Sequence, residues 1–492
     1  MKFWIMNLSM TTTRTPEKGL LTALLASVLL SACAVGPTYV PPAATAVSAW
    51  QAALPHNGDS ASLVAWWSSW NDPTLQGFIE AAQASNRTLE QAAARIAQAQ
   101  AGQTIAGSNA LPNVTGSAAA HRGNSAGGSA LPDAISSVSS TLQAAWELDL
   151  FGANRRGREA ADARLAARNI DWHQARVSLA ADLASAYVNL RVNEALATGY
   201  ERDAASRKET ARLTGLKTNA GFEAPANAAL ANASASEASA RLTSQRAEVD
   251  LGIKAIVSLT GLTEGSVRAA LAADRAKLPA PRNLSVPSVP ATVLAQRPDL
   301  AAAERELAAL SADIGAAEAD RYPRISLSGS VGYSVSRLAG ITTEGVTWGF
   351  GPSLTVPLFD AGRRVANVDL AKARYAESFA GYKAIAIRAV REVEEALTQL
   401  QSAKARANDV QASLAGYQAF EKAALARLSA GAGSVLELQE ARRAVLASEV
   451  AVLALERERL NAWISLYRAV GGGWDRAQAS MDAPVKVSEK TQ

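Results

Sequence analysis

The side chains that most often carry out chemistry are few in this 492-residue sequence, and they lie far apart. Its three histidines, His56, His121 and His173, show none of the spacings with which a chain ligates a metal ion. No glycine-lysine-serine or glycine-lysine-threonine run forms a phosphate-binding loop. We therefore expect a protein that is not an enzyme and that holds no metal and no dissociable cofactor.

The one cysteine, Cys33, closes an N-terminal segment with the features of a secretory signal. A basic start is followed by a short apolar stretch, Gly19–Leu30, and then by small residues. The run Leu30-Ser31-Ala32-Cys33 resembles a bacterial lipobox, in which the cysteine becomes the lipidated first residue. We expect residues 1–32 to be removed and Cys33 to carry covalent N-palmitoyl and S-diacylglycerol groups. The alternative is a buried free thiol beside an ordinary signal peptide.

The charge of the mature chain gives no support to nucleic-acid binding. Of the formal net charge of +4, the signal segment supplies +2, because it holds Lys2, Arg14 and Lys18 against Glu17. The other charges mix both signs along helical stretches, which is typical of solvated helix faces. Beyond the signal no apolar run of about 18 residues occurs, so the sequence predicts no membrane-spanning helix.

Landmarks that recur 210 residues apart indicate an internal repeat. Gly152 and Gly362 each precede a long helical run, and Gly221 and Gly431 each interrupt one. The predicted divisions are a signal peptide (1–32), a lipidated extended segment (33–73), a first repeat (74–261), a linker (262–297), a second repeat (298–473) and a tail (474–492).

Each repeat is expected to read helix, strand, strand, long helix, helix. Ala153–Thr218 and Ala361–Ser429 contain no proline and are rich in good helix formers. At about 1.5 Å per residue each could form a rod of roughly 90–100 Å. Such rods must bury their apolar stripes against other helices, including those of neighbouring chains. Tight turns between helices are expected at Gly221, Gly431 and Gly433.

Four segments change to a period of two, which predicts strands: Pro112–His121, Ser140–Leu150, Arg324–Ser336 and Val346–Phe359. In the last of them Trp348 and Phe350 share a face opposite small polar residues. Each segment has about the ten residues that a tilted strand needs to cross a bilayer. The alternative is an ordinary half-buried sheet. The loops Arg122–Ser137 and Arg337–Gly345 are expected at the outer surface.

The number of strands bears on assembly. In lipid every strand edge must be paired, so a spanning sheet must close into a barrel. The smallest closed barrels have about eight strands, whereas one chain supplies four. A membrane barrel would therefore need at least two chains, and three chains would give twelve strands.

Several segments carry a resemblance to a known family. They are Cys33-Ala34-Val35-Gly36-Pro37-Thr38-Tyr39, Arg297–Glu304, Gly431–Ala441 and Leu466–Trp474. Together they resemble the TolC/NodT class of outer-membrane factors, the exit ducts of tripartite efflux pumps and type I secretion systems. The resemblance implies a mostly α-helical homotrimer with a periplasmic α-barrel of long coiled-coil helices and a 12-strand outer-membrane β-barrel. It also implies docking with a periplasmic adaptor and an inner-membrane RND pump.

The resemblance further implies one site at the turn near the periplasmic tip. In the family two acidic residues three apart follow this turn and face the lumen at its narrow end, and here these positions hold Glu437 and Glu440. Three chains would place six carboxylates in one constriction, and charged rings select ions in narrow pores. The first repeat has Asn227 and Leu230 instead, so only one tip is expected to be acidic. The spacing alone favours two carboxylates on a solvated helix face.

The main hypothesis is a passive duct for small toxic compounds or drugs, anchored by lipid in the outer membrane and extending into the periplasm. A type I duct for secreted polypeptides and a periplasmic coiled-coil scaffold without a pore are the alternatives. Glu394 and Glu395 are expected to be exposed helix charges. Trp66, Trp67 and Trp70 are expected to pack an N-terminal segment rather than to form a ligand cage.

Overall fold

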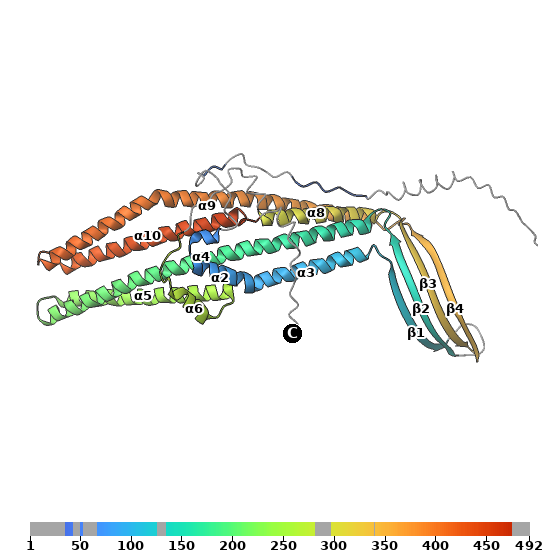
Figure 1. Ribbon diagram of the computed structural model, residues 1–492, viewed down its shortest axis with the longest axis horizontal. Helices are drawn as coiled ribbons and strands as arrows, with labels where there is room; N and C mark the ends of the chain where they lie inside the picture. Colours follow the sequence, from blue (N-terminus) through green and yellow to red (C-terminus); the bar gives the residue numbers. More distant parts are fainter. Residues whose placement is uncertain are drawn as a thin grey trace, which may run out of the picture. The chain divides into compact units, whose positions relative to one another are not determined.

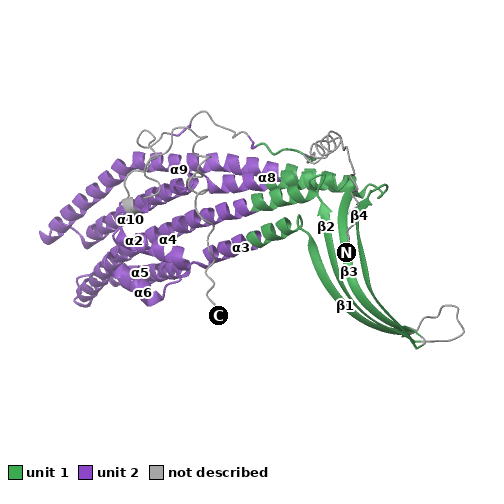
Figure 2. Ribbon diagram, turned by 45° about the vertical axis from the view of Figure 1, so that its right-hand side comes forward, with its two compact units in different colours: residues 1–40, 100–164, 307–377 green, residues 41–99, 165–306, 378–492 purple. Residues whose placement is uncertain are grey.

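The computed structural model describes residues 35–42, 50–52, 66–124, 134–280, 297–338 and 340–474. The predicted signal peptide, Cys33, much of the predicted linker and the tail beyond residue 474 lie outside these ranges. The chain divides into two units (Figure 2). Unit 1 comprises residues 1–40, 100–164 and 307–377, and unit 2 comprises residues 41–99, 165–306 and 378–492.

Both repeats contain the predicted order of helix, two strands, long helix and helix (Figure 1). In the first part of the chain these elements are η2 (Trp67–Trp70), α2 (Pro73–Ser85), α3 (Arg87–Ser108), β1 (Asn113–Asn124), β2 (Ala134–Leu148), α4 (Ala153–Asn219), α5 (Pro225–Thr260) and α6 (Glu264–Ala272). In the second part they are α8 (Pro298–Ala319), β3 (Arg324–Leu338), β4 (Ile341–Thr355), α9 (Arg363–Ser429) and α10 (Val435–Ala469).

The two long rods are present and nearly match their predicted bounds. Helices α4 and α9 have 67 residues each, which corresponds to about 100 Å at 1.5 Å per residue. The next helices begin at local signals: Pro225 is the first residue of α5, and the Ser434 side chain caps α10. None of the helices among the described residues is long and apolar enough to span a bilayer.

The strands form one antiparallel sheet in the order β1-β2-β3-β4. The register pairs Leu148 with Ile325 and Arg324 with Thr355, so the helix-bearing ends of β2, β3 and β4 meet at one end of the sheet. Leu338 pairs with Ile341 at the other end. The apolar side chains of β4 are exposed in the single chain, for example Trp348 at 81% and Phe350 at 73%.

The predicted strand limits were partly wrong. Strand β4 begins at Ile341 rather than Val346, so most of the predicted loop Arg337–Gly345 is strand. Ile341 and two threonines suit a ladder, and Gly340 with φ +81° closes a tight hairpin. The loop predicted over Arg122–Ser137 is also shorter, because β1 reaches Asn124 and β2 begins at Ala134. Strand β4 ends at Thr355, two residues before Pro357.

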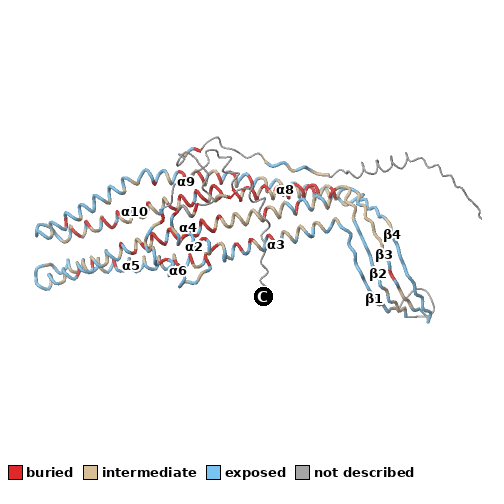
Figure 3. The backbone as a smooth tube through the Cα atoms, viewed as in Figure 1, coloured by how far each residue is buried: buried red, intermediate tan, exposed pale blue. Residues whose placement is uncertain are grey.

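The main core lies in unit 2, where buried residues gather on α2, α4 and α10 (Figure 3). Trp66 and Trp70 are 1% and 0% exposed, and their rings are 5.7 Å apart. Trp66 also stacks on Tyr467 of α10 at 6.1 Å. The predicted packing role of these tryptophans is confirmed.

Glu394 on α9 does not behave as the predicted free surface charge. Its side chain accepts hydrogen bonds from the backbone N–H groups of Gln51, at 2.7 Å, and Ala52, at 2.9 Å. Residues 50–52 lie outside any helix or strand, so their N–H groups need such acceptors, and the two carboxylate oxygens supply them. The prediction of a merely solvated charge was therefore wrong for Glu394, whereas Glu395 is exposed.

Candidate functional site

The turns at the ends of the two helix pairs close in the same way. The N–H of Phe222 donates to the carbonyl of Lys217 at 2.8 Å, and the N–H of Ala432 donates to the carbonyl of Arg427 at 2.9 Å. Both turns need a left-handed residue, which Gly221 and Gly431 supply with φ of +80° and +72°.

Gly433, the third glycine assigned to the turns, meets a different requirement. Its φ is not in the left-handed region. A side chain there would instead collide with the end of α9, because a Cβ would lie 2.9 Å from the backbone nitrogen of Leu428.

Glu437 lies in the first turn of α10, directly after the second helix turn. Its backbone N–H donates to the Ser434 hydroxyl at 3.1 Å, and its side chain forms an ion pair with Arg427 at the end of α9. The Glu437 side chain is 30% exposed. Within one chain, therefore, the Glu437 carboxylate already has a cationic partner that offsets its charge.

Glu440 lies one turn further along α10 and is exposed. The face of α10 that contacts α9 is formed instead by Leu438 and Ala441, which pack on Ala424. The structure thus leaves Glu440 available to solvent or to another chain. The acidic ring that Glu437 and Glu440 would form between three chains stays a prediction.

The first helix turn also carries a carboxylate, which corrects the expectation of a single acidic tip. Asn227, at the position equivalent to Glu437, donates from its side-chain amide to the carboxylate of Glu223. Leu230, at the position equivalent to Glu440, is 63% exposed. Each helix turn therefore presents one partly screened carboxylate, Glu223 or Glu437.

Arg427 was missed from the sequence, although a signal for it existed. In a pair of antiparallel helices, residues equally far from the turn lie opposite one another. Arg427 and Glu437 are five residues on either side of Ala432. A search for opposite charges placed symmetrically about Gly431–Gly433 would have found the pair.

Polar contacts join the two repeats along α4 and α10 in unit 2. Gln439 donates to the Thr210 hydroxyl at 2.7 Å, and Arg442 donates to the Ser206 hydroxyl at 2.6 Å. These contacts border a groove of about 230 Å³ that is lined by α4, α5 and α10. The groove mixes apolar and charged side chains, among them Leu436 and Arg443.

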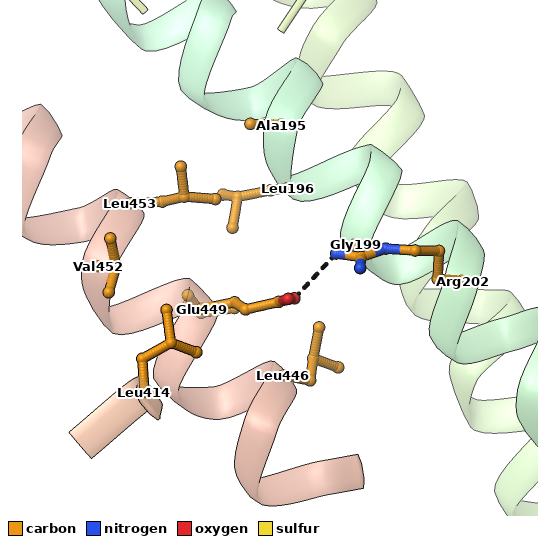
Figure 4. A pocket seen from close by; sticks show the side chains of 10 residues that line it. Ala195, Leu196, Gly199, Arg202, Leu414, Leu446, Glu449, Val452 and Leu453 are labelled. Carbon is orange, nitrogen blue, oxygen red and sulfur yellow. Dashed lines mark hydrogen bonds and ion pairs between the residues drawn. The ribbon is translucent and has the colours of Figure 1, made fainter. Parts of the chain in front are cut away.

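A second cavity, of about 260 Å³, lies further along the same two helices (Figure 4). Leucine side chains of α4 and α10 line it together with Leu414 of α9, and an ion pair between Arg202 and Glu449 at 3.0 Å crosses its edge. Gly199 faces this cavity, where an added Cβ would find Leu446 at 3.5 Å. A methyl group at position 199 would therefore meet α10 at an ordinary van der Waals distance.

The first described residues are held in unit 1, where strands give way to helices. The N–H of Val35 donates to the carbonyl of Phe151 at 3.3 Å, and Arg156 donates to the carbonyls of Val35 and Gly36 at 3.4 Å. Gly36, with φ +94°, lies against Gly315 of α8. Cys33 itself lies outside the described residues, three positions before Gly36.

Among the described residues no cluster of histidine, cysteine, aspartate and glutamate side chains could hold a metal ion. The arrangement offers helix turns, grooves and an exposed sheet. Long helices that continue into a four-stranded sheet with exposed apolar side chains, and no metal cluster among the described residues, fit a membrane-associated protein better than an enzyme with a metal centre.

Comparisons with known proteins show the class to which the chain belongs. The sequence profile of the family described as outer membrane efflux protein matches residues 78–262 and 289–472. Nodulation protein T of Rhizobium leguminosarum bv. trifolii is 32% identical and covers 91% of this chain and 96% of its own length. Outer membrane protein OprJ of Pseudomonas aeruginosa is 31% identical, covering 95% and 98%. The solved structure of the outer-membrane channel OprN is similar with a TM-score of 0.79 at 31% identity, covering 90% of this chain and 100% of that chain.

The chain belongs to the outer membrane efflux protein family. It is an outer-membrane exit duct whose helical part extends into the periplasm. The fold class, the family and the outer-membrane location predicted from the sequence are thereby confirmed.

Proposed function

We propose that three copies of this chain form one lipid-anchored duct that conducts small toxic compounds passively out of the cell. In this proposal an inner-membrane RND pump supplies the energy and a periplasmic adaptor joins the pump to the duct. The chain has no catalytic role in it. Cys33 carries the N-palmitoyl and S-diacylglycerol groups.

The observation that carries the proposal is the four-stranded sheet with two open edges. Strands β1 and β4 lie at these edges, and each is paired on one side only among the described residues. Unpaired backbone groups are very costly in lipid, so the edges must meet other strands. Three copies, joined β4 to β1, would supply twelve strands and close the sheet. The exposed apolar side chains of β4 would then face lipid.

The nature of the cargo is supported by relatives that are named for small substrates. A toluene efflux pump outer membrane protein of Pseudomonas putida is 28% identical over 92% of this chain. A cation efflux system protein of Escherichia coli is likewise 28% identical over 92%. Neither name mentions a polypeptide, which favours small-molecule efflux over type I protein secretion.

The test is a conductance measurement on purified full-length protein in planar lipid bilayers, with the mass of the inserted species determined by native mass spectrometry. We expect discrete channels and the mass of three chains. Purified protein that inserts but never conducts would contradict passive conduction by the assembly of this chain alone. A conducting species of another mass would contradict the trimer alone.

The lipid anchor is tested separately with Cys33→Ser. We expect this variant to lose the acyl mass and to be recovered poorly from the outer membrane. Normal recovery would show that the sheet alone anchors the protein. The cargo is tested in a cell that lacks the chain, where restored tolerance to organic solvents but not protein secretion is expected on re-expression.

A further inference from the structure

Arginines gather where the strands of unit 1 join its helices. They are Arg155, Arg156, Arg158, Arg321, Arg324, Arg363 and Arg364, from the β2–α4, α8–β3 and β4–α9 junctions. The sheet register brings the three junctions to one end of the sheet, since Leu148 pairs with Ile325 and Arg324 pairs with Thr355. Seven guanidinium groups therefore belong to one end of a four-stranded sheet.

Three of these arginines are neutralised within the chain. Arg156 pairs with Glu159, Arg324 with Asp320, and Arg364 with Asp360. The other four, Arg155, Arg158, Arg321 and Arg363, are exposed and form no ion pair within the described residues. We call these four the junction arginines. Glu159, four residues after Arg155, pairs with Arg156, and Asp149 accepts from the backbone N–H of Arg155 rather than from its guanidinium.

Apolar side chains accompany this unpaired charge. Leu358 and Phe359, between β4 and α9, are each 91% exposed, and Tyr322, next to Arg321, is 42% exposed. Exposed aromatic and aliphatic groups beside long cationic side chains suit the boundary of a bilayer. The apolar groups enter the acyl region there, and the guanidinium groups reach the headgroups.

The charge pattern of the strands places the junction arginines at such a boundary. No charged residue occurs in Ala134–Trp146 of β2, Ile325–Ser336 of β3 or Gly345–Thr355 of β4. At the end that bears the helices, the first charged residues beyond these stretches are Glu147, Arg324 and Asp360. The junction arginines follow a few positions further on, Arg155 nine residues after Trp146, Arg321 four residues before Ile325 and Arg363 eight residues after Thr355. The strands are long enough to cross the hydrocarbon region when tilted.

The first described residues of the chain lie at one of the same strand–helix junctions. Val35 is hydrogen-bonded to Phe151, which lies only four residues before Arg155. Gly36 follows Cys33 by three positions, and extended chain covers at most about 3.5 Å per residue. An acylated Cys33 would therefore place its lipid within about 10 Å of Gly36, close to the same junctions.

We propose that the junction arginines bind the phosphate groups of anionic phospholipids in the membrane leaflet nearest the helices. This proposal rests on the proposed function only in that the sheet must lie in a membrane. Arginine suits the role because its planar guanidinium binds phosphate oxygens in a bidentate manner. The bound lipids would fix the depth of the sheet in the bilayer together with the acyl chains of Cys33.

The experiment compares three proteins in nanodiscs of phosphatidylethanolamine with a minor fraction of phosphatidylglycerol. They are the wild type, a variant with Arg→Gln at positions 155, 158, 321 and 363, and a control variant. The control carries Arg95→Gln, Arg275→Gln, Lys404→Gln and Arg457→Gln, which removes the same charge from exposed positions of unit 2 that form no ion pair within the described residues. Native mass spectrometry after mild extraction counts the phosphatidylglycerol retained.

The wild type and the control should retain phosphatidylglycerol at roughly fivefold its bulk fraction. That factor corresponds to about 1 kcal/mol per basic residue near an anionic surface. The junction variant should retain it at the bulk fraction. Inorganic phosphate at millimolar concentration should not displace the lipid, because it lacks acyl chains.

Equal enrichment in the junction variant and the wild type would overturn the proposal, and so would equal loss in the junction and control variants. Displacement by inorganic phosphate would show a simple anion site instead. A change of oligomeric mass confined to the junction variant would show an interface between copies. Conductance is measured on the same samples: wild type that conducts without lipid enrichment contradicts this proposal alone, whereas failure to insert at all contradicts the proposed function.

Discussion

Gly36 packs its backbone directly against Gly315 of α8, although the two residues are far apart in sequence. A Cβ on Gly36 would lie closer to the Cα of Gly315 than van der Waals contact permits, and φ at Gly36 is +94°. On the other side, a Cβ on Gly315 would lie 2.9 Å from Nε of Arg156. Two glycines and one arginine thus hold the first described residues of the chain in unit 1.

Replacing Gly36 with alanine should release this N-terminal segment. The substitution adds an atom where none fits and disfavours the required φ, so we expect a loss of about 1–3 kcal/mol locally. Hydrogen exchange of residues 35–42, followed by mass spectrometry, should become markedly faster. Gly102→Ala is the control, because no atom lies within 4 Å of the Cβ that it would add. Unchanged protection of residues 35–42 in Gly36→Ala would show that the contact does not hold the segment.

Replacing Glu194 with glutamine should be strongly destabilising. The Arg191 and Glu194 side chains are 0% and 6% exposed and pair at 2.8 Å, and Glu194 also accepts from the N–H of Ala276. The neutral amide would leave a buried guanidinium without its counter-charge, which costs about 3–5 kcal/mol. Thermal unfolding followed by circular dichroism should therefore shift to a clearly lower temperature.

Glu90→Gln provides the control for that prediction. Glu90 pairs with Arg87 on the surface, where the two side chains are 67% and 86% exposed. Such pairs contribute little, about 0–1 kcal/mol, so the unfolding temperature should hardly change. Equal shifts of the unfolding temperature in the two variants would mean that the buried ion pair contributes no more to stability than the exposed one.

The sequence predicted the helices well because the signals for them are local. Residues 153–218 have no proline and many good helix formers, and α4 ends one residue later, at Asn219. The start of β4 was placed five residues late, because Glu344 and Gly345 interrupt the apolar alternation. Pairing with β3 outweighs the poor local propensity of these two residues, and a single strand does not reveal its partner.

The candidate sites were less predictable, because their contacts also join segments that are distant in the sequence. The contact between Gly36 and Gly315 needs knowledge of how the chain start approaches α8, which no local pattern contains. The ion pair between Arg427 and Glu437 needs the register of two antiparallel helices. The family resemblance identified Glu437. It did not identify Arg427, whose positive charge offsets that of Glu437.

Tyr467 should make the fold sensitive to alkali. Burial among tryptophans raises the pKa of Tyr467 to about 12, because the charged phenolate is poorly solvated there. In the unfolded chain the tyrosine ionises near about pH 10. The unfolded state therefore loses its proton first, and stability falls as the pH rises from about 10 to about 12.

The measurement is the unfolding temperature of wild type and Tyr467→Phe across that pH range. The phenylalanine variant cannot ionise, so its unfolding temperature should fall less steeply with pH. Tyr417→Phe is the control, because Tyr417 is 43% exposed. If the unfolding temperatures of wild type and Tyr467→Phe fall equally steeply with pH, Tyr467 is not a source of the loss of stability in alkali.

Variants at the second helix turn should change the cation preference of the channel in opposite directions, depending on whether they remove acidic or basic side chains. Glu437→Ala with Glu440→Ala removes both carboxylates and should weaken the cation preference of the channel. Arg427→Gln removes the cation that pairs with Glu437 and should strengthen that preference, since more negative charge is left uncompensated. The reversal potential across a salt gradient in planar bilayers measures both effects, and Glu248→Ala, at an exposed position on α5, is the control.

The paired design separates a ring at a constriction from two solvated charges. If Glu437 and Glu440 face a narrow lumen in three copies, the two kinds of variant must move the reversal potential in opposite directions. Charges on an outer helix face are screened by salt within about 10 Å and would leave the potential unchanged in both variants. A shift in the same direction for both would mean that the turn changes shape rather than charge. Raising the salt concentration on both sides should shrink the shifts if the effect is electrostatic.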